Sequence, residues 1–217
     1  GEMAVSMVKI AVPSTLQQSI VHMGILLVQS VVNSFGSAAL AGYSAGSRIE
    51  SLSIVPMLAM GNAMSTFTAQ NMGAGKIDRV KEGYRMCYVI VLTAGAVLCV
   101  MYQLAGGAFV SLFLDSGSSE AYSVGLSYVK FLSFFYSFIG LKASTDGLLR
   151  GAGDVTAFTV ANLVNLAIRV SVTNLFAPIY GIQVAWMAVP LGWAANYVIS
   201  FGWYLTGKWK KVRVIKK

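Results

Sequence analysis

The sequence has few charged residues. Only 11% of its 217 residues are Asp, Glu, Lys or Arg, whereas 56% are hydrophobic. A soluble domain of this size carries about 25% charged residues, so these side chains are too few to cover a wetted surface. The composition excludes an ordinary soluble globular protein and predicts an integral membrane protein.

Residues that carry metal or redox chemistry are also scarce. The chain has one histidine, His22, and two cysteines, Cys87 and Cys99, which share one apolar segment. Two cysteines spaced along a single helix cannot form a disulfide, so we expect buried free thiols. The sequence has no paired Cys/His ligands and no HExxH motif, so we expect no metal site.

One short motif resembles a hydrolase signature. GYSAG, residues 42–46, matches G-x-S-x-G, which requires a strand, a turn and a helix. Here the motif falls inside a predicted helix. Residues 42–46 and 147–151 also read as G-x-x-x-G, which is typical of close helix packing. We therefore predict packing rather than catalysis and expect that the protein is not an enzyme.

Six apolar segments are long enough to cross a bilayer, which takes about 20 helical residues. They lie near residues 12–32, 40–71, 84–104, 122–142, 157–176 and 182–205. The connections between them are short and rich in Gly, Ser, Asn or Pro, so no soluble domain fits anywhere. The pattern predicts an all-α integral membrane protein in which residues 1–217 form a single six-helix transmembrane lobe. Pro56 lies inside the second segment and permits a bend there.

The basic residues outside the spans all lie on one side of the predicted membrane. The connections on the other side contain Asp115 and Glu120 but no Lys or Arg. Basic loops stay in the cytoplasm, so both termini are predicted to be cytoplasmic, next to anionic membrane lipids. This topology explains the net charge of +8 without a nucleic-acid partner. The residues concerned are Lys9, Lys76, Arg79, Lys81, Arg85, Arg150, Lys208, Lys210, Lys211, Arg213, Lys216 and Lys217.

Polar side chains form stripes on two of the spans. On a helical wheel the first stripe covers an arc of about 100°, and the fifth span repeats the pattern. Hydrocarbon does not accept such a stripe, so it faces either other helices, as packing hydrogen bonds, or water. We predict that these residues line a cleft: Gln18, His22, Gln29, Asn33, Asn165 and Arg169.

Four further charged residues, in the spans or at the end of one, need partners. Lys142 and Asp146 are one helical turn apart near the inner end of the fourth span and are able to pair. Arg48 and Glu50 point to different faces of their helix, so each requires a partner on another helix. All four are candidates either for ion coupling or for a structural charge.

Four sequence stretches, taken together and in this order, resemble the MATE family of multidrug and toxic-compound extrusion transporters. They are AVPSTLQQS (11–19), QNMGAGKIDR (70–79), LLRGAGD (148–154) and PLGWAANYVISFGWYLTGKWK (190–210). The resemblance covers almost the whole chain, and the chain as a whole resembles the second half of such a transporter. It implies one lobe of a twelve-helix, two-lobe protein with a central cleft. An N-terminal six-helix half is then the expected companion, and the absence of an initiator Met agrees with a piece of a longer protein.

The resemblance also implies a function. The expected activity is secondary active export of cationic or amphipathic small molecules from the cell across the plasma membrane, driven by Na⁺ or H⁺ and without another cofactor. Some family members hold a coupling acid in the first and fourth helices of this lobe, where this chain has Val21 and Ile139. The coupling acid then lies in the other lobe, or this member couples differently. The alternative is a lipid-linked oligosaccharide flippase of the same superfamily architecture, which needs a strongly cationic cavity.

Overall fold

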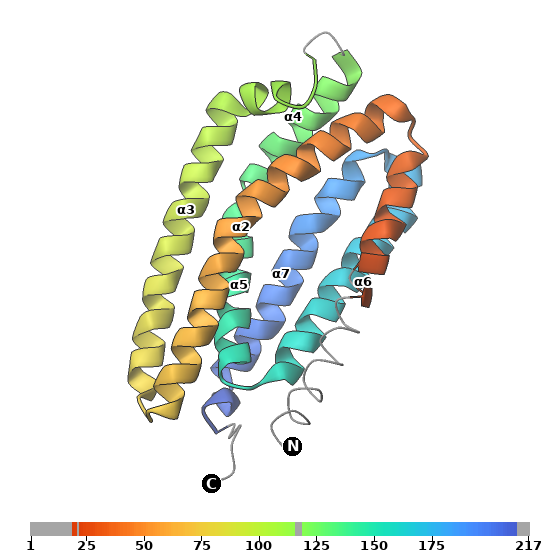
Figure 1. Cartoon of the computed structure of the whole chain (residues 1–217). Coiled ribbons are helices and arrows are strands. Elements are labelled where there is room, and N and C mark those ends of the chain that lie inside the picture. Colours follow the sequence, from red (N-terminus) through yellow and green to blue (C-terminus); the bar gives the residue numbers. More distant parts are fainter. Residues whose placement is uncertain (1–18, 21, 116–118, 212–217) are drawn as a thin grey trace, which may run out of the picture.

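The computed structural model describes residues 19–20, 22–115 and 119–211, and every regular element in these ranges is helical (Figure 1). The long helices run side by side in one bundle. The α2–α3 and α5–α6 turns lie at one end of it, together with η1. Near the start of the described part lies a short helix, His22–Asn33, which is called the first helix below. It is followed by α2 (Ser37–Gly73), α3 (Ile77–Ser111), α4 (Ser119–Ser133), α5 (Tyr136–Gly151), α6 (Val155–Tyr180), α7 (Gln183–Leu205) and the 3₁₀ turn η1 (Lys208–Lys211).

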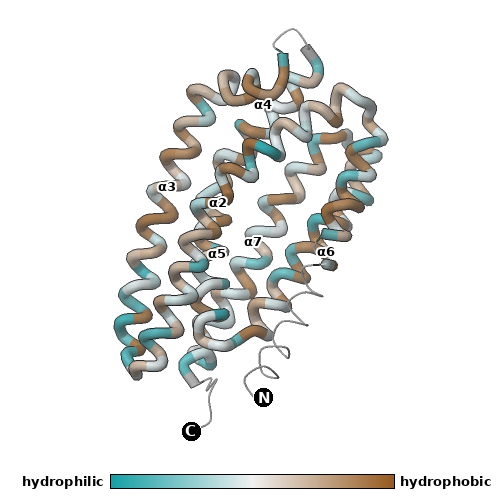
Figure 2. The backbone as a smooth tube through the Cα atoms, viewed as in Figure 1, coloured by the Kyte–Doolittle hydropathy of each residue, from teal (hydrophilic) through white to brown (hydrophobic). Residues whose placement is uncertain are grey.

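Four of these helices, α2, α3, α6 and α7, are long and apolar enough to cross a membrane. The bent pair of α4 and α5 brings the number to five when the two helices are counted together as one broken span. Figure 2 shows hydrophobic residues along most of their length. Large apolar side chains such as Leu52, Leu104 and Ile179 are exposed, as a lipid-facing surface requires. The first predicted span, 12–32, begins outside the described residues, so the number of six spans stays a prediction.

The predicted fourth segment, 122–142, is divided between two helices. Helix α4 ends at Ser133, α5 begins at Tyr136, and the two are bent by 54°. The break leaves backbone carbonyls of α4 without helical partners. At the Lys130 carbonyl, two side chains compensate. Ser133 Oγ donates to it at 2.7 Å, and Gln103 Nε2 of α3 donates to it at 2.8 Å and to Ser133 Oγ at 2.9 Å. A broken span is tolerated in a membrane when a neighbouring helix satisfies the freed groups in this way.

Glycines bring α2 against α4 and α5. A Cβ at Gly42 would collide with the Ala121 carbonyl of α4, and one at Gly147 would collide with the Gly61 carbonyl of α2. These are the close backbone approaches that small residues allow between membrane helices. The packing prediction for residues 42–46 and 147–151 is confirmed. Both cysteines are free thiols; Cys87 is buried as expected, whereas Cys99 is only partly buried.

Helix α2 also continues without a break through Pro56. It packs mainly on α5 and α4, while α6 packs mainly on α7, and α5 joins the two groups through its contacts with α7. The first helix lies beside this arrangement: the side chain of Leu166 on α6 fills the space over Gly24. The N-terminal half of α2 and the middle of α6 therefore border the same region as the first helix.

Candidate functional site

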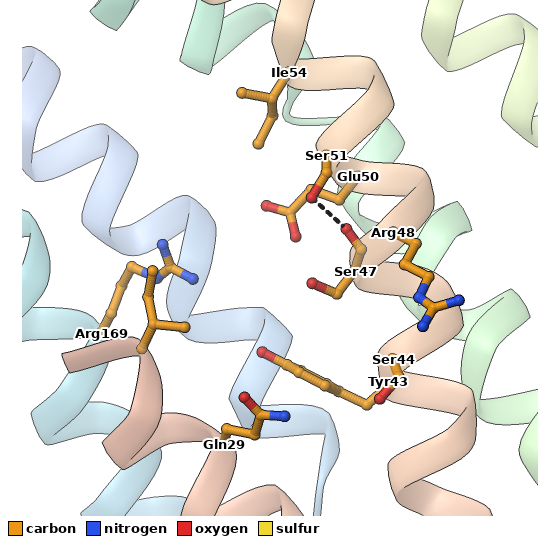
Figure 3. A pocket seen from close by; sticks show the side chains of 10 residues that line it. Gln29, Tyr43, Ser44, Ser47, Arg48, Glu50, Ser51, Ile54 and Arg169 are labelled. Atoms are coloured by element: carbon orange, nitrogen blue, oxygen red, sulfur yellow. Dashed lines mark hydrogen bonds between the residues drawn. The ribbon is translucent and has the colours of Figure 1, made fainter. Parts of the chain in front are cut away.

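A polar cavity of about 410 Å³ lies between the first helix, α2 and α6 (Figure 3). Most of its side chains come from one stretch of α2, and the other two helices supply three more. Its lining consists of Ile25, Gln29, Tyr43, Ser44, Ser47, Arg48, Glu50, Ser51, Ile54 and Arg169. Three charged residues, Arg48, Glu50 and Arg169, thus meet at one cavity within the predicted spans.

The spacing along α2 explains why it lines the cavity. Tyr43, Ser47, Glu50, Ser51 and Ile54 follow at steps of four, three, one and three residues, which places them on one face of a helix. Ser51 Oγ donates to the Ser47 carbonyl at 2.8 Å, so its hydroxyl is satisfied without a ligand. This face of α2 is therefore polar, and the Ser51 hydroxyl on it has a hydrogen-bond partner even when the cavity holds no ligand.

Glu50 is the acid of the cavity. The residue is only 7% exposed, and the hydroxyl of Tyr128 on α4 donates a hydrogen bond to its Oε2. The Tyr128 ring lies edge-on to Tyr43, with ring centroids 5.3 Å apart, and packs on Trp186 of α7 at 5.5 Å. A carboxyl group buried this deeply requires a polar partner. Tyr128 supplies the partner, and the aromatic neighbours fix the position of Tyr128.

Arg169 approaches the cavity from α6, with its guanidinium turned toward the Glu50 carboxyl group (Figure 3). The two residues interact electrostatically but do not form a direct ion pair in the described coordinates. Helix α7 comes so close at Gly192 that a side chain there would meet Arg169 and Asn165. Within the described part of the chain, neither Arg169 nor Arg48 has a hydrogen-bonded partner. The cavity thus presents free guanidinium donors beside a partnered acid.

The structure brings together some of the predicted residues and separates others. Gln29, Arg169, Arg48 and Glu50 all line the cavity. His22 and Asn33 are exposed and are not part of its lining. Asn165 is one helical turn from Arg169, but its Oδ1 is buried against Gly192 and has no hydrogen-bond partner among the described residues. Gln18 lies outside the described residues. The cleft-lining role of all six candidate residues stays a prediction.

A second polar cluster joins α5, α6 and α7. Lys142 Nζ lies 2.9 Å from Asp146 Oδ2, so the two form the ion pair that their spacing allows. The same ammonium donates to Asn162 Oδ1 at 3.1 Å. Ser200 Oγ donates to Asp146 Oδ1 at 2.6 Å. The cluster therefore ties three helices together inside the bundle.

Sequence reasoning missed the α2 residues around Glu50. Tyr43, Ser47 and Ser51 repeat at intervals of four residues, a signal that marks one face of α2 and was available in the sequence. Tyr128 had no such signal. Its contact with Glu50 joins residues far apart in the chain and depends on how α4 packs on α2.

Comparisons with known proteins identify the family of the chain. The MatE family model matches residues 13–175, most of the chain. The probable multidrug resistance protein YpnP of Bacillus subtilis is 28% identical over 95% of this chain and 46% of its own length. The probable multidrug resistance protein NorM of Thermotoga maritima is 21% identical over 96% of this chain and 45% of its own length. The chain spans about half the length of the curated relatives it matches.

Solved structures show the same fold. A transporter of the MOP superfamily from Pyrococcus furiosus superposes with a TM-score of 0.84 at 17% identity, over 94% of this chain and 45% of that one. An outward-facing MATE multidrug resistance transporter superposes with a TM-score of 0.84 at 18% identity, over 96% and 47%. The family match, the membrane-spanning helices and the shared fold lead to one conclusion: the chain is a multi-pass membrane protein that belongs to the MatE family, the multidrug and toxic compound extrusion transporters.

Proposed function

We propose that this chain is one lobe of a secondary active transporter that exports cationic or amphipathic compounds across the plasma membrane. A second six-helix half of the same transporter faces the cavity, inward movement of Na⁺ or H⁺ drives export, and both termini are cytoplasmic. Membership of the MatE family, relatives named as multidrug resistance proteins and a match to half of their length support this proposal.

The observation that carries the proposal is the cavity between the first helix, α2 and α6. Amphipathic compounds need both polar and apolar contacts, and the cavity offers Glu50 and Arg169 beside Ile25 and Ile54. The Tyr43 ring adds a face that attracts cations. In the alternating-access mechanism of such folds, two lobes rock around a site at their interface, and this cavity is the polar surface that the lobe contributes to it.

The flippase alternative is not favoured by the charges. Four basic residues fall within the predicted spans, but only Arg48 and Arg169 line the cavity. Lys142 is held in an ion pair with Asp146, and Glu50 offsets one of the remaining positive charges. A site for a pyrophosphate-linked lipid needs a strongly positive surface, which this cavity does not provide.

Efflux measurements on the full-length transporter that contains this lobe test the proposal. We expect Arg169→Met and Glu50→Gln each to weaken export of a substrate that contacts the cavity about 10- to 100-fold, which corresponds to the loss of one hydrogen bond to a charged group. Arg85→Met is the matched control, because Arg85 is exposed on α3 and far from the lining in the chain. Unchanged export in both cavity variants, at equal amounts of protein in the membrane, would refute the assignment of the cavity.

A further inference from the structure

The polar cluster inside the bundle is built like a cation site. Its oxygen atoms come from three helices: Asp146 on α5, Asn162 on α6, and Ser200 with Asn196 on α7. None of these residues lines the cavity described above. Carboxylate, carboxamide and hydroxyl oxygens are the ligand types that hard cations prefer. An ammonium group occupies this set of oxygens, because Lys142 Nζ contacts both Asp146 Oδ2 and Asn162 Oδ1.

The burial of the cluster favours a cation beside its carboxylate. Asp146 is 4% exposed, and Ser200 and Asn196 are completely buried. An ionised carboxylate in such surroundings is costly unless a positive charge compensates it. Lys142, whose side chain is 12% exposed, supplies that charge from one turn earlier on the same helix. Among the described residues, this pair is the sole ion pair whose two members are both largely buried.

The cluster also has more polar groups than one ion pair uses. Asn196 is completely buried, yet its Nδ2 has no hydrogen-bond partner among the described residues. Its Oδ1 receives only a long bond of 3.4 Å from Ser200 Oγ. A buried carboxamide that is half satisfied is unusual, and it lies against the hydroxyl that binds Asp146. The Nδ2 is a donor and cannot bind a cation, but the Asn196 Oδ1, which accepts only this long bond, is an oxygen ligand still available on the α7 side.

We propose that Asp146, Asn162, Ser200 and Asn196 form a monovalent-cation site whose resident cation is the tethered ammonium of Lys142. In this sequence the site does not take up a dissociable Na⁺. Without the ammonium, the same oxygens bind Na⁺. The inference deepens the proposed transport function, because it assigns ion coupling to another group, such as Glu50 or an acid of the companion half.

Thermal unfolding of the purified full chain in detergent tests this inference without any transport measurement. Lys142→Met removes the ammonium but keeps an unbranched side chain, and the melting temperature is measured in sodium chloride and in choline chloride at equal ionic strength. We expect no sodium-specific difference for the natural sequence. For Lys142→Met we expect a Tm higher in sodium by about 3–6 °C when Na⁺ is at about ten times its Kd.

The double variant Lys142→Met/Asp146→Asn is the control, because it removes the negative charge that holds the ion, and we expect it to lose the sodium effect. Lys142→Ala is a second single variant that leaves more room for an ion with water. A sodium-specific rise in Tm for the natural sequence would overturn the inference. Single variants that respond equally to both salts, or that fail to fold in either salt while the double variant folds, would also overturn it. Since the readout is stability, a failure of drug export leaves this result intact.

Discussion

The hydroxyl of Tyr128 donates a hydrogen bond to the Glu50 carboxylate and thereby joins α4 to α2 in the interior of the lobe. The contact connects the cavity with the buried core of the lobe. Glu50 faces the cavity together with Arg169, while Tyr128 is completely enclosed by protein and packs on Trp186. The position of the cavity acid is therefore set by the packing of α4, the helix that ends at the 54° break.

Tyr128→Phe should destabilise the lobe by about 1–3 kcal/mol, because it leaves a buried carboxylate without its donor. Chemical unfolding in detergent measures this cost. Glu50→Gln changes the same contact from the other side, so the double variant should cost clearly less than the two single costs added together. Additive costs would show that the two side chains do not depend on each other.

Gly147→Ala should destabilise the lobe by about 1–3 kcal/mol, since its Cβ would collide with the Gly61 carbonyl and push α5 away from α2. Gly202→Ala is the matched control. Gly202 is also helical, but a Cβ there meets nothing within 4 Å. The control should be neutral or stabilising by about 0.5–1 kcal/mol, through higher helix propensity. Equal effects of the two substitutions would argue against close α2–α5 packing.

Trp209→Ala should release the segment after α7. The Trp209 side chain is completely buried, stacks on Tyr204 with ring centroids 5.6 Å apart, and donates from its Nε1 to the Tyr204 carbonyl at 3.0 Å. Loss of such a side chain costs about 3–5 kcal/mol. Limited trypsin digestion should then cut after Lys208 faster than in the natural sequence. Leu205→Ala, which truncates a side chain that is 66% exposed, should leave the rate unchanged. A Trp209 variant cut at the natural rate would contradict the docking of η1.

Gln103→Leu should destabilise the break between α4 and α5 by about 0.5–1.5 kcal/mol, because the Lys130 carbonyl loses its donor from α3 and keeps only the Ser133 hydroxyl. Hydrogen exchange at the amides of residues 130–138 should rise more than exchange elsewhere in the bundle. Gln183→Leu, at an exposed position at the start of α7, serves as the comparison. Uniform exchange across the bundle would show that Gln103 does not support the break.

Much of the fold follows from the apolar pattern. The segment 40–71 corresponds to α2 at 37–73, and 182–205 corresponds closely to α7 at 183–205, because hydrocarbon leaves long helices as the main option. The break at residues 134–135 was not predictable. No Gly or Pro marks it, and it depends on Gln103 reaching across from α3. Such a tertiary contact leaves no local signal in the sequence.

The candidate site was predictable in part. The costly charges Arg48, Glu50 and Arg169 were recognised individually, and the structure places them around one cavity. The wheel of the first span selected Gln29, which lines the cavity, and Asn33, which lies at the end of its helix and outside the lining. The cleft-lining role of both stays a prediction. The sequence pattern of a single helix identifies its polar face, but it does not show where along the helix another helix approaches. The convergence of α2 and α6 determines that position.

The central claim is that the cavity of this lobe is open to water within an otherwise apolar protein. Cysteine labelling tests it directly, after Cys87 and Cys99 have been replaced by alanine. Ser47→Cys places a thiol in the cavity, whereas Leu52→Cys places one on the exposed apolar surface of α2. Thiolates form in water and not in hydrocarbon. In the membrane-embedded full-length transporter, we expect a charged, water-soluble maleimide to label Ser47→Cys much faster than Leu52→Cys, and an exported substrate to slow that labelling. Labelling of Leu52→Cys alone, or of neither thiol, would contradict the account.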